Sequence, residues 1–389
     1  MNHIRPVFLL ACLLAGWPVF SAEVETLDHR IPPGYEPVEA EDELGLWMEM
    51  REYEQALKQS ALLVRDPDLN DYLQEIVCRV AAAYCKDFRV YLIRNPDFNA
   101  SMTATGMMQV WTGLIVRANS TDEIAAVIGH EISHYTLLHS LATLRALKKK
   151  LATGTFVDIA LILATGYGTG LGQTMAALSV MSFSREQETE ADLLGVRLLA
   201  EAAYDPHASY GIWQKIIAEE EAAEVKREKP GAFGKTHPDA KLRAAYLKEL
   251  VTARYGPPDV EAVADQRLLS VLNNNYMLLM EDQLDTNRYG RTKELLERHA
   301  ALGVEPSLVR YFYGEMFRQR GKEGDRDLAK SAYLHSVELG KAPAKAYSNL
   351  GYLYLKEGDT ESARTYFAKY LDIDPDASDR DMIEFYLED

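Results

Sequence analysis

Three polar residues in the segment AAVIGHEISHYTLLHS have the types and spacing that metal-assisted hydrolysis requires. His130 and His134 are four residues apart, so on a helix they share one face and can place two imidazole nitrogens on one zinc ion. Glu131 lies beside them and can accept a proton from the water that attacks a carbonyl group. The same short motif occurs on ordinary helices, so the pattern alone leaves both interpretations open.

A catalytic zinc site needs a third protein ligand as well as an open position. A third histidine on the same helix would need glycine at 137 and histidine at 140, where Leu137 and Ser140 stand instead. The later segment ETEAD offers Glu188 as the ligand. Asp192, four residues further on, can accept the Nδ1 hydrogen of a ligand histidine. The alternative is that this acidic cluster is exposed helix surface.

Local patterns indicate the elements that must position these residues. Ser120 or Thr121, followed by acidic residues, is a good N-cap for the motif helix. Asp68 is the expected cap of an earlier helix. FRVYLI (88–93) and MMQVW (107–111) are rich in β-forming residues, and they predict two strands of a small sheet.

The N-terminus has the order of a secretory signal, with a basic start, an apolar run and small residues near position 22. The run is too short for a stable transmembrane helix, and an uncleaved anchor is the alternative. Export would place Cys78 and Cys85 in an oxidising compartment, which favours a disulfide. On a straight helix they would lie about 10 Å apart, whereas bridged Cα atoms lie within about 7 Å. The disulfide therefore requires the helix to end near Tyr84.

The composition bounds the domain number and the class of partner. A chain of 389 residues is long enough for two or three domains. The formal net charge of -17 argues against nucleic acid as a partner, because phosphate binding needs a basic patch. Residues 151–182 combine a short apolar run with clustered glycines. We expect two short helices that cover or flank a site, with membrane-surface contact as the alternative.

The C-terminal part repeats. Ala329 and Ala363 are 34 residues apart, and so are Tyr333 and Phe367, which is the period of the tetratricopeptide repeat. Stacked helix pairs of this kind share a core and present a concave surface. The segment YGPPD before these repeats marks a domain boundary.

The two separated motifs, HEISH and SREQETEADLLG, resemble the HtpX and CAAX-protease-like zinc metallopeptidases over roughly residues 40–250. The order of signal, peptidase segment and repeats is similar to that of the BepA-like periplasmic proteases in that family. The resemblance implies a set of site residues: zinc ligands His130, His134 and Glu188, general base Glu131, and the outer carboxylate Asp192.

Further histidines could take part in the site. His237, in THPDAKLR, matches a His-Pro of the same family. It is expected either to approach the zinc as a displaceable fourth ligand or oxyanion stabiliser, or to be a surface histidine that caps the next helix. His139 is expected to pack near the motif helix, and Glu190 to lie on a face away from the metal. His207 and His299 are expected on the surface.

The resemblance also predicts an edge strand before the motif helix. A substrate backbone would add to such a strand by β-augmentation. The resemblance lies in the segment from Asn99-Ala100 to Thr112-Gly113-Leu114, and the edge strand is expected near Met107, Met108, Gln109 and Val110.

We therefore expect a mainly α-helical chain, with an α+β catalytic domain of the gluzincin type followed by a helical repeat array. The expected domains are a signal peptide at 1–22, a zinc metallopeptidase domain at 23–254 with an active-site lid at 151–182, and a tetratricopeptide-like domain at 260–389.

The resemblance implies one Zn²⁺ per chain and cleavage of misfolded or stalled envelope proteins in the periplasm. The repeats would recruit protein clients or the outer-membrane assembly machinery, and peripheral membrane contact is compatible with this location. The alternative is a chaperone or scaffold for outer-membrane protein assembly, with a latent or structural metal site. Glu131 favours the enzyme, because a structural site has no use for a general base.

Overall fold

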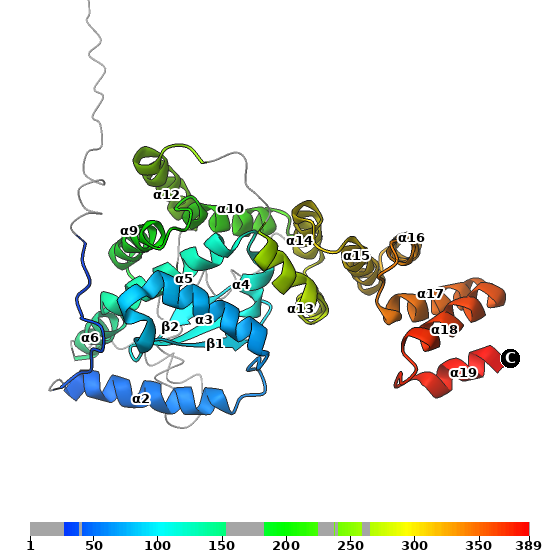
Figure 1. The fold of residues 1–389 in the computed structure, drawn as a ribbon, viewed down its shortest axis with the longest axis horizontal. Helices are drawn as coiled ribbons and strands as arrows, with labels where there is room; N and C mark the ends of the chain where they lie inside the picture. The colour runs from blue at the N-terminus through cyan, green and yellow to red at the C-terminus, as the bar shows by residue number, and fades with distance from the viewer. Residues whose placement is uncertain are drawn as a thin grey trace, which may run out of the picture.

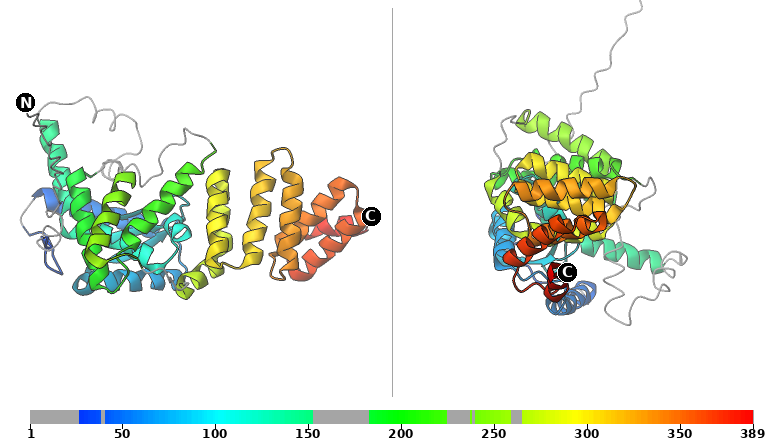
Figure 2. Two further views of the ribbon diagram at one scale, coloured as in Figure 1. Left: turned by 90° about the horizontal axis from the view of Figure 1, so that it is seen from above. Right: turned by 90° about the vertical axis from the view of Figure 1, so that its right-hand side faces the viewer.

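Helices dominate the chain, as the sequence predicts. The computed structural model describes residues 27–38, 41–152, 183–224, 237, 240–258 and 265–388. Figure 1 shows helices around a small sheet in the N-terminal part, and Figure 2 shows paired helices that extend from it in a row. The expected signal lies outside these ranges, and so does the expected lid apart from its first two residues. In the described ranges, every helix is too short or too polar to cross a bilayer.

The helices of the N-terminal part are α2 (Glu41–Lys58), α3 (Pro67–Ala81), the 3-10 helix η1 (Ala82–Asp87), α4 (Thr112–Arg117), α5 (Thr121–Thr136), α6 (His139–Ala152), α9 (Arg185–Glu201), α10 (Ala208–Glu221) and α12 (Ala240–Tyr255). The repeat helices are α13 (Gln266–Asp285), α14 (Tyr289–Leu302), α15 (Pro306–Arg320), α16 (Asp325–Glu338), α17 (Ala344–Glu357), α18 (Thr360–Ile373) and α19 (Arg380–Glu388). The strands are β1 (Arg89–Ile93), β2 (Ala100–Met102) and β3 (Met107–Trp111).

The three strands form one sheet in the order β1-β3-β2. Strand β1 is parallel to β3, whereas β2 is antiparallel to it. Both strands that the sequence predicts are therefore present, as β1 and β3. Helix α5 packs close to β2, and α3 contacts both α5 and β1. The sheet thus supports the helix that carries the histidine motif.

The edge strand does not run through the four residues near which the sequence places it. Met107, Met108, Gln109 and Val110 lie in β3, which is the middle strand of the sheet. Their main-chain groups pair with β1 on one side and β2 on the other, so β3 has no free edge for a substrate. The three-residue β2 provides the edge next to α5 instead. A strand this short carries too little pattern to predict from sequence.

Capping residues define the ends of the helices beside the site. Ser120 caps α5, and its side chain accepts a hydrogen bond from the backbone N–H of Glu123. Asp66, rather than the predicted Asp68, caps α3 through the backbone N–H of Leu69. Asp68 lies in the first turn, because the helix begins one residue earlier, at Pro67.

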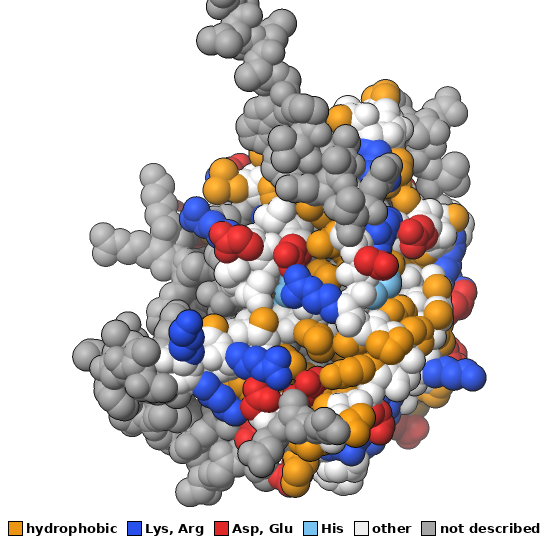
Figure 3. All heavy atoms as spheres, turned by 90° about the vertical axis from the view of Figure 1, so that its left-hand side faces the viewer, with side chains coloured by type: hydrophobic (Ala, Val, Ile, Leu, Met, Phe, Trp, Pro, Cys, Tyr) orange, Lys and Arg blue, Asp and Glu red, His pale blue; other side chains and the backbone are white. Residues whose placement is uncertain are grey.

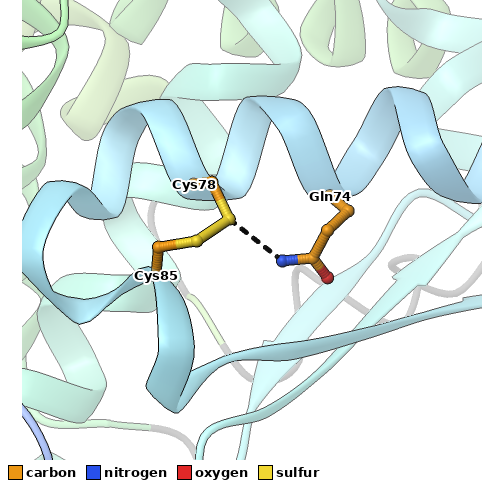
Figure 4. The surroundings of a disulfide bond; sticks show 3 residues. All are labelled: Gln74, Cys78 and Cys85. Carbon is orange, nitrogen blue, oxygen red and sulfur yellow. Dashed lines mark hydrogen bonds between the residues drawn. A yellow bond between two sulfur atoms is a disulfide. The ribbon is translucent and has the colours of Figure 1, made fainter.

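Helix α3 ends early enough for a disulfide. Ala82 leaves the helical conformation with φ 48°, and η1 folds the chain back. Cys78 and Cys85 then lie with their Cα atoms 4.4 Å apart and form a disulfide (Figure 4). The side-chain amide of Gln74, one turn earlier, donates to the Cys78 sulfur at 3.2 Å. The covalent link fixes the end of the helix that packs against α5.

Helices α5 and α9 cross at a pair of glycines. Gly129 precedes His130 in α5, and Gly195 lies three residues after Asp192 in α9. A Cβ atom added at Gly195 would lie 3.2 Å from the backbone nitrogen of His130. The two backbones can therefore approach more closely than larger side chains would permit. This contact brings the motif helix and the acidic helix together.

The repeat helices pack as the alignment of the sequence predicts. In α15, a Cβ added at Gly314 would lie 2.4 Å from the ring of Tyr333 in α16. In the next pair, Gly351 stands in the same relation to Phe367 at 2.5 Å. Each glycine thus makes room for the aromatic ring of its partner helix, which explains why these positions recur together.

The first repeat helices pack directly on the N-terminal part. Buried Glu219 of α10 accepts from Nε of Arg117 in α4 at 2.9 Å and from Arg298 in α14 at 2.5 Å. The predicted surface position of His299 is wrong, since it is 1% exposed. Its ring contacts the hydroxyl of Tyr276 at 2.9 Å and the carbonyl of Val116 at 2.8 Å. Helices α13 and α14 are therefore fixed to α4 and α10.

Candidate metal centre

The three residues of the histidine motif lie buried on α5. His130 is 5% exposed, Glu131 is 2% exposed and His134 is 1% exposed. The Nε2 atoms of the two histidines are 3.0 Å apart. Two nitrogens that bind one tetrahedral zinc at about 2.0–2.1 Å lie about 3.3 Å from each other. The helix thus presents both imidazoles to a single point, as the four-residue spacing predicts.

Helix α9, which crosses α5 at the two glycines, supplies the carboxylates of Glu188 and Asp192. It begins at a capping box in which Ser184 and Gln187 exchange hydrogen bonds, so its first turn has a fixed direction. Glu188 follows in that turn, with its carboxylate oxygens 3.5 Å from His130 Nε2 and 3.6 Å from His134 Nε2. Asp192 Oδ1 lies 2.9 Å from His130 Nδ1, the nitrogen that faces away from the cluster. The structure therefore brings together all five residues that the resemblance implies.

His237 joins the cluster from the segment before α12. Its Nδ1 lies 2.8 Å from Glu188 Oε1 and 3.3 Å from His130 Nε2. Its Nε2 lies 3.6 Å from Glu131 Oε1. One ligand atom from each of four residues falls within a 4.8 Å group: His130, His134, Glu188 and His237. Of the two alternatives for His237, the structure disfavours the surface histidine, because this side chain is 3% exposed.

The donor set suits zinc. Imidazole nitrogens and a carboxylate oxygen are the ligands of catalytic zinc sites. Among the described residues, Glu131 Oε1 is buried without a hydrogen-bond partner, as expected for a group that awaits a partner in the active state. His130, His134 and Glu188 would hold the ion, and His237 would supply a fourth ligand. A bound zinc would supply Lewis-acid polarisation of a carbonyl and a more acidic water.

Arg243 is a site residue that the sequence did not reveal. It lies on α12, six residues after His237, and is 3% exposed. Its Nε donates to Asp192 at 2.9 Å, and its NH1 lies 2.9 Å from Glu188. The guanidinium stacks on Trp213 of α10 at 4.3 Å from the ring centroid. The segment THPDAKLR contains both His237 and Arg243, which is the only signal that could have linked the arginine to the site.

The charges of these groups are set by burial and by one another. Burial disfavours the Asp192 carboxylate, but Arg243 and the hydrogen bond from His130 more than compensate and lower its pKa to about 2. Burial dominates at Glu131, with a contribution from the Glu188 charge, and raises its pKa to about 8. Asp192 is thus a fixed anion, whereas Glu131 is placed to exchange a proton near neutral pH.

Aromatic rings cover the second ligand histidine. Phe183 stacks on His134, with ring centroids 3.9 Å apart and an interplanar angle of 18°. His139 lies against the other ring nitrogen, with Nδ1 2.8 Å from His134 Nδ1. On the face that Figure 3 draws, histidine side chains appear only as small patches among hydrophobic and charged side chains. This agrees with the burial of the cluster.

A histidine pair from one helix, a carboxylate from a second helix and a glutamate beside them define a metallopeptidase centre of the HEXXH type. Comparison with known proteins agrees with this class. The family model for peptidase family M48 matches residues 64–251, and the tetratricopeptide repeat model matches residues 344–377.

Curated relatives include both bacterial and mitochondrial proteases. The chain is 29% identical over 262 residues to the beta-barrel assembly-enhancing protease of Yersinia pestis, covering 63% of this chain and 52% of that protein. It is 27% identical over 270 residues to the protein of that name from Escherichia coli K12, covering 64% and 54%. It is 30% identical over 185 residues to the mitochondrial metalloendopeptidase OMA1 of Schizosaccharomyces pombe, covering 46% and 52%. The chain thus spans about half the length of these relatives.

Proposed function

We propose that this protein is a periplasmic, zinc-dependent endopeptidase that cleaves misfolded or stalled envelope proteins. The observation that carries the proposal is the position of Glu131. Its carboxylate is buried beside two histidines and Glu188, with one oxygen unsatisfied among the described residues. A structural metal site needs ligands alone, whereas hydrolysis needs a base at this position.

The residues of the chain divide the work of peptide hydrolysis. His130, His134 and Glu188 hold the ion, and Asp192 fixes the ring of His130 by accepting from Nδ1. Arg243 forms ion pairs with both Glu188 and Asp192 and holds the two carboxylates in place. Glu131 takes the proton of the attacking water and passes it to the leaving amine. Burial of Glu131 favours this transfer, because it raises the pKa of the carboxyl group to about 8.

The substrate backbone would add to β2, whose outer edge pairs with no strand among the described residues. The carbonyl of Asn99 accepts a hydrogen bond from Trp111 of β3, and the backbone N–H of Thr103 donates to Met107, so the main-chain groups of the alternate residues Ala100 and Met102 point away from β3. Helix α5, which carries Glu131, packs against β2, so this edge lies next to the helix that bears the base. An extended peptide on β2 would bring its scissile carbonyl to the metal cluster.

The relatives and the repeats support the proposed location and clients. Beta-barrel assembly-enhancing proteases are named for the assembly of β-barrels, and the N-terminal sequence has the order of an export signal. Outer-membrane proteins in assembly are therefore the proposed clients. The tetratricopeptide array would recruit these clients or the assembly machinery through its concave surface.

The experiment that tests this function compares wild type with Glu131→Gln. Both purified proteins are incubated with a denatured outer-membrane protein, and cleavage products are followed by mass spectrometry. We expect wild type to degrade the client, and the variant to lose at least 100-fold in rate. Equal rates would refute the protease function.

A second candidate function is a chaperone with a latent site, and the position of His237 favours it. Its ring contacts Glu188 and His130, two of the proposed zinc ligands, and could occupy the fourth position on the ion. Removing this ring by His237→Ala should raise the cleavage rate if the histidine holds the site closed. Complementation separates the two functions, because full rescue of a deletion strain by Glu131→Gln would favour the chaperone.

A further inference from the structure

His134 has an outer partner that differs from that of His130. The Nε2 atom of His134 faces the metal cluster, 3.0 Å from His130 Nε2. Its other nitrogen, Nδ1, lies 2.8 Å from Nδ1 of His139. His139 is fully buried, and its Nε2 lies 3.0 Å from Glu190 Oε2. The second ligand histidine is thus followed by a second imidazole and then by a carboxylate.

The Glu190 carboxylate at the end of this hydrogen-bonded chain determines which nitrogen of each imidazole carries the hydrogen. An ionised carboxylate only accepts, so His139 Nε2 carries a hydrogen and donates it to Glu190. The Nδ1 atom of His139 is then an acceptor, and it receives the Nδ1 hydrogen of His134. That leaves a lone pair on His134 Nε2, which is the form that binds a metal. His130 reaches the same form with Asp192 as its direct acceptor.

A strained backbone conformation next to His139 holds its ring in this position. Leu138 links α5 to α6 with φ 56°, a left-handed conformation that is unfavourable for a leucine. The turn reverses the chain within five residues, so the first residue of α6 returns over His134. Strain of this kind is retained where the surrounding structure needs it.

An N-terminal segment anchors the carboxylate. Arg30 NH2 donates to Glu190 Oε2 at 2.9 Å, and its NH1 donates to the carbonyl of Leu137 at 3.1 Å. The backbone N–H of Arg30 donates to the carbonyl of Thr136, at the last turn of α5. Arg30 therefore ties Glu190 to the end of the motif helix. Glu190 faces away from the metal ligands, as the sequence predicts, yet it belongs to this row.

We propose that His139 and Glu190 are positioning residues for the metal ligand His134, and that they set its tautomer and the orientation of its ring. The proposal rests on the proposed zinc site. It assigns His139 more than the packing role that the sequence predicts. Glu190 would act through His139 and would not contact the metal.

The test measures zinc affinity in the full-length protein by competition with a chromophoric chelator. His139→Asn retains an acceptor oxygen close to the position of Nδ1, whereas His139→Leu retains bulk without an acceptor. Loss of an outer partner weakens metal binding about 10–100-fold. We expect that loss for His139→Leu and recovery of most of it in His139→Asn. Glu190→Ala should weaken binding by a smaller factor, and Glu201→Ala, at an exposed site on the same helix, should leave it unchanged.

A packing role predicts the reverse order. Leucine would then preserve the site better than asparagine, and zinc affinity would follow the stability of each variant. Equal zinc affinity of wild type, His139→Leu and Glu190→Ala would overturn the proposal. Glu190→Ala decides the question if His139→Leu does not fold, because Glu190 is one-third exposed. Failure of the proposed function would be recognised separately, because in that case the wild-type protein itself would bind no zinc.

Discussion

The glycine crossing of α5 and α9 makes a quantitative prediction about the site. Gly195→Ala would add a methyl group 3.2 Å from the His130 nitrogen and 3.3 Å from its Cα atom. Because these are backbone atoms, a side-chain movement cannot relieve the close contact. The two helices must instead separate by a few tenths of an ångström. Overpacking of this kind costs about 1–3 kcal/mol. Alanine returns about 1 kcal/mol through helix propensity, which leaves a net loss of about 0–2 kcal/mol.

A matched control isolates the packing contribution. Gly45 lies on the exposed face of α2, and a Cβ atom added there meets no heavy atom within 4 Å. Gly45→Ala should therefore gain about 1 kcal/mol of stability from propensity alone. The free energies of unfolding of the two variants should differ by about 1–3 kcal/mol in urea titrations. Zinc affinity should fall for Gly195→Ala, because the crossing of α5 and α9 sets the distance between His130 and Glu188. It should stay unchanged for Gly45→Ala, because Gly45 lies on α2, away from this crossing.

One result would refute this reasoning. If Gly195→Ala stabilised the protein as much as Gly45→Ala and bound zinc with wild-type affinity, the close crossing would not determine the geometry of the site.

Three further predictions concern stability. Replacing Cys78 and Cys85 by serine should lower the free energy of unfolding by about 2–3 kcal/mol, because the loop that they close is short; urea titration with and without reductant checks this. Glu219→Gln should cost about 3–5 kcal/mol, since it leaves two buried arginines without their counter-charge, and a thermal melt should show the loss. Burial lowers the pKa of His299 to about 4, so the unfolded chain binds a proton first and stability falls with acid. Between pH 7 and pH 5 wild type should lose about 2 kcal/mol more than His299→Asn, and an equal loss would contradict this assignment.

The site residues that the structure brings together, as the sequence predicts, share a local cause. His130 and His134 are placed by the period of one helix, and Glu188 and Asp192 by the period of another. The repeat alignment succeeded for the same reason, because an alanine and an aromatic ring recur four residues apart with a period of 34 residues. Helical periodicity fixes which residues share a face, and it requires no knowledge of the rest of the chain.

The residues that sequence reasoning missed depend on tertiary contacts. Arginines are mostly exposed, and only the fold shows that Arg243 is buried against two carboxylates. His139 reaches His134 through a left-handed turn at Leu138. The sequence does not predict this turn, because the turn contains none of the residues that usually favour turns. The position of the edge strand was not predicted correctly, because β2 has only three residues. His299 was placed on the surface because nothing local shows that α14 packs against Val116.

The most direct test of the central claim is a zinc titration of metal-stripped protein with peptide cleavage as the readout. We predict no cleavage in excess chelator and a linear rise in rate that ends at one zinc per chain. Glu131→Gln should bind the same single zinc and remain inactive, whereas Glu188→Ala should bind it much more weakly. Full cleavage by the metal-stripped protein, or wild-type activity in Glu131→Gln at one bound zinc, would contradict a zinc endopeptidase built on these residues.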